Sequence, residues 1–192
     1  MIQTDNVLDA KGLACPMPIV KTRKIMKGME GGQVLEVQST DSGTTADLQA
    51  WAESVGHQYV GNVKETDMWR HFLRKAGQED QSNKEYPFTV DNSQLLERLQ
   101  HPEAILIDVR EEAEYAFAHI PGALSIPLGQ LEERMAYLNK DDKYFVVCRT
   151  GNRSDMACRK LVASGFECVT NVIPGMSEWN GETENTTGGM NK

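Results

Sequence analysis

The chain lacks any long apolar run, and its first residues, Met-Ile-Gln-Thr-Asp-Asn, lack the basic and apolar regions of a signal peptide. We therefore predict a cytoplasmic protein with no membrane partner. The four cysteines form no CxxC pair, and no histidine lies close in sequence to Cys148, Cys158 or Cys168. This spacing disfavours both a disulfide framework and a zinc site. We expect reduced thiols, no metal and no cofactor.

Positive charge is scarce in the C-terminal part of the chain. Residues 1–76 hold nine Lys+Arg and nine Asp+Glu, whereas residues 77–192 hold eleven and nineteen, which accounts for the whole net charge of −8. An acidic C-terminal part argues against nucleic acid as a direct ligand. Hydrophobic residues at 40% and charged residues at 25% are ordinary for a globular protein.

The most informative stretch surrounds Cys148. The apolar run Tyr144 to Val147 predicts a buried strand that ends on this cysteine, and a helix is expected over 155–163 with Ser154 as its N-cap. Loop amides, a helix N-terminus and two arginines then favour negative charge at one point. We predict that Cys148 is a nucleophilic thiolate and that the loop binds a small anionic substrate through Arg149, Thr150, Gly151, Asn152 and Arg153.

A second cysteine, Cys15, precedes Pro16 and a helical pattern of apolar residues. Proline is favoured at the first helical position, so Cys15 is expected near a helix N-terminus, where the dipole should lower the pKa of a thiol. The alternative is that Cys15 serves as a small buried hydrophobic residue. The residues alone leave both readings open.

The remaining patterns divide the chain into four parts. Residues 1–76 predict a two-layer α+β domain with the order βαβαββ. Residues 77–86 are polar and unpatterned and are expected to be a linker, which would span roughly 17–19 Å if flexible. Residues 87–182 alternate helix and strand, which predicts an α/β domain with a central parallel sheet and a ligand site at the carboxyl ends of its strands. Residues 183–192 are expected to be a disordered tail.

The N-terminal residues resemble a known family. Leu-Asp-Ala-Lys-Gly-Leu-Ala-Cys-Pro-Met-Pro, then Thr-Asp-Ser-Gly, Asp-Leu-Gln-Ala-Trp and Gly-His, are similar to the TusA-like sulfur-carrier proteins over about residues 5–75. In that family the cysteine of the Cys-Pro-x-Pro motif carries a persulfide. The resemblance assigns this role to Cys15. His57 falls in the matching Gly-His pair and is expected to be structural.

A second resemblance covers about residues 86–182. Asp-Val-Arg-Glu at 108–111, His-Ile-Pro-Gly-Ala at 119–123, the 148–154 loop and Pro-Gly-Met-Ser-Glu-Trp at 174–179 resemble a single-domain rhodanese. The family's loop cysteine holds sulfane sulfur as a persulfide, and this position is Cys148. Many relatives have glycine at position 174, and the proline here is expected to stiffen the wall of the site. The four residues between Cys148 and Arg153 are one fewer than in the phosphatases that share the fold, which favours sulfur transfer.

Five further residues have expected supporting or structural roles. Asp108 and Arg110 are supporting residues, interpreted as a strand-end ion pair that orders the loop, with direct substrate contact as the alternative. His119 is expected to pack and hydrogen-bond. Cys158 and Cys168 are expected to be inert core thiols.

These features predict a sulfurtransferase of the rhodanese, thiosulfate sulfurtransferase type. Cys148 would take sulfane sulfur from thiosulfate or a low-molecular-weight persulfide and relay it to Cys15 or to an external thiol or acceptor protein. One alternative is a persulfide carrier that a partner protein loads and that has no turnover of its own. The other is a redox sensor in which Cys15 and Cys148 form a disulfide.

Overall fold

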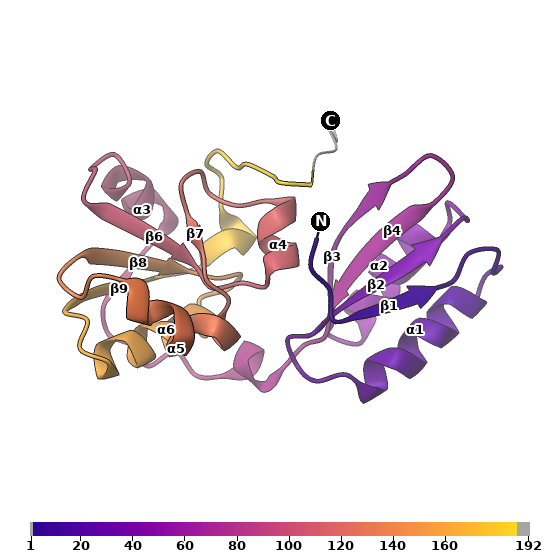
Figure 1. The fold of residues 1–192 in the computed structure, drawn as a ribbon, viewed down its shortest axis with the longest axis horizontal. Helices are drawn as coiled ribbons and strands as arrows, with labels where there is room; N and C mark the ends of the chain where they lie inside the picture. Colours follow the sequence, from indigo (N-terminus) through magenta and orange to yellow (C-terminus); the bar gives the residue numbers. More distant parts are fainter. Residues whose placement is uncertain (1, 188–192) are drawn as a thin grey trace. The chain divides into compact units, whose positions relative to one another are not determined.

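The computed structural model describes residues 2–187, which divide into two compact units: residues 2–78 with 186–187, and Glu79–Asn185. Each unit has its own sheet and its own buried core (Figure 1). Within the described residues, no helix is both long enough and apolar enough to cross a bilayer.

The first unit has the predicted βαβαββ order. Its elements are β1 (Asn6–Asp9), α1 (Met17–Gly28), β2 (Val34–Ser39), α2 (Thr44–Ser54), β3 (Gln58–Lys64) and β4 (Trp69–Arg74). The strands lie in the order β1-β2-β4-β3, with β1 parallel to β2 and the other pairs antiparallel. Alternate β2 residues, Leu35 and Val37, pack with Met26 of α1 and Leu48 of α2. This period-2 alternation therefore directs one face of the sheet toward the helices.

The second unit has the predicted central parallel sheet. Its elements are β5 (Thr89–Val90), α3 (Asn92–Arg98), β6 (Ala104–Asp108), α4 (Glu112–Phe117), β7 (Leu124–Ser125), η2 (Leu128–Gln130), α5 (Leu131–Arg134), η3 (Met135–Tyr137), β8 (Lys143–Val147), α6 (Asn152–Ala163), β9 (Cys168–Val172) and η4 (Gly175–Glu178). The strand order is β5-β9-β8-β6-β7. Figure 1 shows α3 and α6 on opposite sides of this sheet.

Strand β8 shows why both faces of the second sheet are covered. Tyr144 and Val146 belong to the core that contains Leu161 of α6, whereas Phe145 and Val147 belong to the core that contains Leu95 of α3. A strand between two helix layers needs an apolar residue at every position. The uninterrupted apolar run before Cys148 meets that requirement.

The start of α6 differs from the prediction. The helix begins at Asn152 rather than Asp155, and its N-cap is Gly151 rather than Ser154. Gly151 has φ +92°, a left-handed conformation that glycine adopts without steric cost. Arg153 and Ser154 are consequently part of the first helical turn, so their side chains leave the helix in fixed directions. Two other helical segments are short: the 131–137 region combines α5 with the 3₁₀ turn η3, and the 175–178 region forms the 3₁₀ turn η4.

The segment predicted as a linker is ordered against the second unit. A 3₁₀ turn, η1 (Gln78–Gln81), begins it, and the amides of Glu85 and Tyr86 donate hydrogen bonds to Asp155. A flexible-chain span therefore does not describe residues 79–86 in this structure. Near the other end, Glu184 exchanges backbone hydrogen bonds with His119, so order extends past the predicted start of the tail at 183. Residues 188–192 of that predicted tail lie outside the described residues.

Candidate active site

Cys148 follows β8 directly and lies at the carboxyl end of a central strand, with only 1% of its surface exposed. The backbone N–H of Gly151 donates to its Sγ at 3.1 Å, and the Ser154 hydroxyl donates to the same atom at 3.3 Å. Donors directed at sulfur stabilise its anionic form. The loop therefore directs two hydrogen-bond donors at the Cys148 sulfur.

The segment after β9 holds the backbone of the same cysteine. The amide of Met176 donates to the Cys148 carbonyl, and the amide of Ser177 donates to the Arg149 carbonyl, both at 2.9 Å. Gly175 has φ +81°, and a Cβ at this position would collide with the Cys148 carbonyl oxygen. Glycine is required here because the two chain segments touch through their backbones.

Arg153 is placed differently from the sequence prediction. Its guanidinium is buried and makes a bidentate contact with Glu114 of α4, at 2.7 and 2.9 Å. Burial opposes the charge, but the Glu114 carboxylate, together with Cys148 and Asp80, raises the pKa of Arg153. Asp80 and Glu111 also approach it, at 3.8 and 3.9 Å. Arg153 therefore anchors α6 to α4, because Glu114 takes the Nη1 and Nη2 edge of the guanidinium. Its contact with substrate stays a prediction.

Of the other predicted loop residues, some lie at the loop surface and others make hydrogen bonds that hold the loop in place. Arg149 is exposed, and Thr150 is half-buried. Gly151 contributes the amide that donates to Sγ, while its carbonyl accepts from Asn171 at 3.2 Å. The Asn152 side chain donates to the carbonyls of Asp80 and Ser82. Arg149 is thus the predicted cation that the structure leaves at the loop surface.

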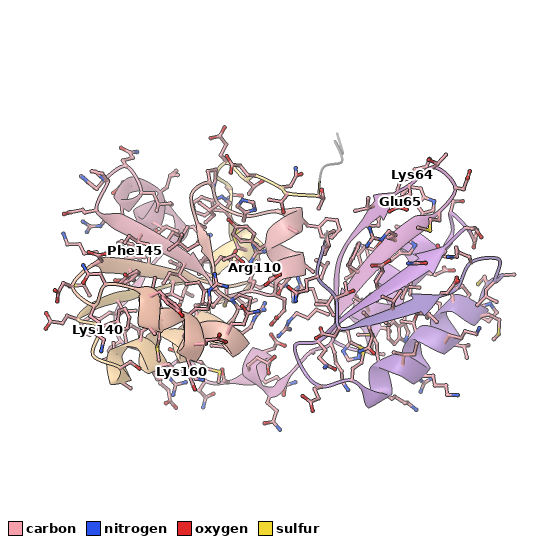
Figure 2. All side chains as sticks on the ribbon, viewed as in Figure 1. Lys64, Glu65, Arg110, Lys140, Phe145 and Lys160 are labelled. Carbon is pink, nitrogen blue, oxygen red and sulfur yellow. The ribbon has the colours of Figure 1, made fainter. Side chains whose placement is uncertain are left out.

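Asp108 and Arg110 form a buried ion pair at the end of β6, with Nη2 and Oδ2 2.6 Å apart. Arg110 also donates to the Ala118 carbonyl and lies inside the unit, whereas Lys140 and Lys160 lie at its surface (Figure 2). His119 stacks on Tyr115 at 3.7 Å between ring centroids and hydrogen-bonds the Tyr115 carbonyl. All three residues have structural contacts in this conformation.

The two remaining cysteines of this unit differ from each other. Cys158 is fully buried on α6, and burial is the largest of the causes that raise its pKa. Cys168 is exposed, so the expectation of a core thiol is wrong for this residue. It is the first residue of β9, where the strand has not yet entered the core. Among the described residues, no group of His, Cys, Asp and Glu is arranged to hold a metal ion.

Cys15 is exposed and immediately precedes Pro16, the N-cap of α1. Its pKa is raised, mainly by a hydrogen bond to the Asp47 carboxylate, with desolvation adding to the effect. This direction is opposite to the lowered pKa expected at a helix N-terminus, because the Asp47 carboxylate disfavours a second negative charge beside it. Asp47 lies in the first turn of α2, a position that sequence spacing did not connect with Cys15.

Three contacts are not predicted from the sequence: those of Ser154 with Cys148, of Asp47 with Cys15 and of Glu114 with Arg153. The sequence predicts Ser154 only as a helix cap. Its position directly after Arg153, at the end of the cysteine loop, is the signal that could have placed it near Cys148. No sequence pattern indicates the contacts of Glu114 and Asp47. Their partners, Arg153 and Cys15, lie far from them in the sequence.

The two units match two protein families. Residues 6–75 match the family described as Sulfurtransferase TusA, and residues 91–182 match the Rhodanese-like domain. Cys15 lies within the first match and Cys148 within the second. The chain belongs to the family of proteins that join a TusA domain to a rhodanese domain.

Individual relatives agree with this assignment. YrkF of Bacillus subtilis (strain 168), whose name describes a candidate sulfur carrier protein, is 48% identical over 185 residues, covering 96% of this chain and all of YrkF. YrkI of the same organism, also named as a candidate sulfur carrier, is 50% identical over 39% of this chain and all of YrkI. YtwF, named as a candidate sulfurtransferase, is 42% identical over 50% of this chain and 92% of YtwF.

The Ser154 hydroxyl is predicted to support the reactivity of Cys148. Ser154→Ala should slow the alkylation of Cys148 by iodoacetamide about threefold to tenfold at neutral pH, because a charge-assisted hydrogen bond is lost while the remaining thiolate gains some nucleophilicity. Peptide mass spectrometry measures the rate. Ser164→Ala, at the other end of α6, is the control and should leave the rate unchanged. Equal rates in both variants would contradict the role of Ser154.

The Glu114–Arg153 pair is predicted to dominate the stability of the second unit. Glu114→Gln should lower its free energy of unfolding by about 3–5 kcal/mol, because it removes the nearest counter-charge of a buried guanidinium and leaves only Asp80 and Glu111 at 3.8 and 3.9 Å. Urea denaturation provides the measurement. Glu132→Gln removes an exposed partner of Lys160 and should cost less than about 1 kcal/mol. Similar losses in the two variants would show that burial does not strengthen the Glu114 pair.

Asp47 is predicted to keep the Cys15 thiol protonated. Asp47→Asn should lower the pKa of Cys15, so the midpoint of its alkylation rate should move to lower pH and the rate at neutral pH should rise. Glu53→Gln removes the same charge from the end of α2 and serves as the control. An identical midpoint in Asp47→Asn and the wild type would refute the assignment.

Proposed function

We propose that this protein is a sulfurtransferase in which Cys148 takes sulfane sulfur from a small donor and passes it to Cys15 or to an external thiol. The observation that carries the proposal is the pair of hydrogen bonds donated to the Cys148 sulfur at the end of β8. Membership of the TusA and rhodanese families supports it, since relatives with either domain are named as sulfur carriers or sulfurtransferases.

The proposed chemistry consists of two thiol exchange steps. With thiosulfate as donor, the Cys148 thiolate attacks the outer sulfur, the sulfur–sulfur bond of thiosulfate breaks, and sulfite leaves with the electron pair. Cys148 then holds a persulfide. An acceptor thiolate attacks the outer sulfur of that persulfide, and Cys148 leaves as a thiolate. A low-molecular-weight persulfide enters by the same first step and releases a thiolate in place of sulfite.

Within this proposal the two loop arginines have different roles. Arg149 is exposed and is the residue we assign to the negative end of the donor. Arg153 positions α6 through Glu114. Because the carboxylates around Arg153 offset its charge, the attraction of an anionic donor rests mainly on Arg149 and the loop amides.

A second candidate is a persulfide carrier that a partner protein loads. The name of YrkF as a candidate sulfur carrier, together with its coverage of nearly the whole chain, favours this alternative. The two candidates differ in one respect: the carrier has no sustained turnover of a small donor on its own. A turnover assay with thiosulfate and a simple thiol acceptor separates them.

The order of transfer can be tested by mapping persulfide on the full-length protein. After exposure to thiosulfate, wild type should carry added sulfur on both Cys148 and Cys15, Cys15→Ser only on Cys148, and Cys148→Ser on neither cysteine. Mass spectrometry of alkylated peptides makes the measurement, with Cys168→Ser as the control for an exposed thiol. Loading of Cys15 at the wild-type level in Cys148→Ser would reject the relay.

A further inference from the structure

Residues 79–86, named here the strap, follow the α6 helix along its first two turns. They form part of the second unit, although their composition is that of a linker. The strap contacts α6 at Asn152, Asp155 and Arg159, three residues spaced so that they share one helix face. The strap is therefore attached to the helix that completes the Cys148 site.

Asn152 attaches the first part of the strap. Its side-chain amide donates to the carbonyl of Asp80 at 3.1 Å and to the carbonyl of Ser82 at 2.8 Å. Asn152 directly follows Gly151, whose amide donates to the Cys148 sulfur. One residue thus links the strap to the backbone that holds the sulfur.

Asp155 attaches the end of the strap. Its Oδ2 accepts the amides of Glu85 at 3.0 Å and Tyr86 at 2.6 Å, and its Oδ1 pairs with Arg159 at 3.0 Å. The Asp155 side chain is fully buried, so the strap amides satisfy a carboxylate that would otherwise be costly to bury. Tyr86 continues into the core and donates its hydroxyl to the Val169 carbonyl at 2.8 Å.

The strap also covers the loop at Gly151. A Cβ at Gly151 would lie 3.4 Å from Cε of Lys84 and 3.0 Å from Cγ1 of Ile173. The outer side of the loop is therefore packed between the strap and the end of β9. A side chain at position 151 would therefore meet both Ile173 and Lys84.

We propose that the strap is a positioning element of the active site and that Asn152 couples it to the Cys148 loop. The strap holds Gly151 and Ser154 in the arrangement in which both donate to sulfur. In this role Asn152 contacts the strap and not the substrate. The proposal therefore assigns Asn152 a positioning role in place of the substrate-binding role predicted from the sequence. The catalytic consequence rests on the proposed sulfurtransferase activity, whereas the structural consequence does not.

The test compares Asn152→Ala and Asn152→Asp with Asn139→Ala in the full-length protein. Asn139 makes a similar side-chain contact, to Asp142, in an exposed turn. Trypsin cleavage after Lys84 reports release of the strap, and deuterium exchange of the 149–154 peptide reports movement of the loop. Both changes at position 152 should speed cleavage and exchange about tenfold, because two hydrogen bonds are lost, while Asn139→Ala should change neither.

The activity readout separates positioning from binding. The Asn152 variants should lower kcat about threefold to tenfold with thiosulfate, with KM within twofold of wild type. Cleavage after Lys84 that is equally fast in wild type and the variants would show that Asn152 does not hold the strap. Faster cleavage with unchanged loop exchange would show that the strap does not position the loop. If wild type has no turnover, the proposed function fails, but cleavage and exchange still decide whether the strap acts as described.

Discussion

The Cys148 site depends on the buried ion pair between Arg153 and Glu114. This pair joins the first turn of α6 to α4, two helices that follow neighbouring strands of the parallel sheet. With the helix start fixed, the Gly151 amide and the Ser154 hydroxyl converge on one sulfur atom. Removal of the Arg153 guanidinium would leave the buried Glu114 carboxylate without its partner, which is energetically unfavourable.

Cys15 and Cys148, the cysteines of the two family motifs, differ in burial and in the groups beside them. Cys148 is buried among hydrogen-bond donors, whereas Cys15 is exposed beside the Asp47 carboxylate, which raises its pKa. Sulfur exchange begins with a thiolate. In the proposed relay Cys15 must itself attack the Cys148 persulfide as a thiolate, so the Asp47 carboxylate opposes this second step as long as it stays beside Cys15.

The strap shows that a polar, unpatterned segment can be held in place on a domain. Its side chains contribute little to a core, and its attachment comes mainly from backbone groups: two carbonyls that accept from Asn152 and two amides that donate to Asp155. Backbone groups are present in every sequence, so composition cannot reveal this attachment. The positions that disclose it, Asn152 and Asp155, lie about seventy residues further along the chain.

The sequence by itself determined the two domains, the order of their elements and the two family cysteines, because period-2 and helical patterns and the Cys-Pro-x-Pro and loop motifs are local. It placed the start of α6 three residues too late, since Ser154 is a good cap residue and only the packed loop shows that its hydroxyl is directed to Cys148. The tertiary structure alone decided that Arg153 pairs with Glu114, that Asp47 raises the pKa of Cys15, that Cys168 is exposed and that the linker joins the second unit. Each of these depends on charge, burial or hydrogen bonds between segments that only folding brings together.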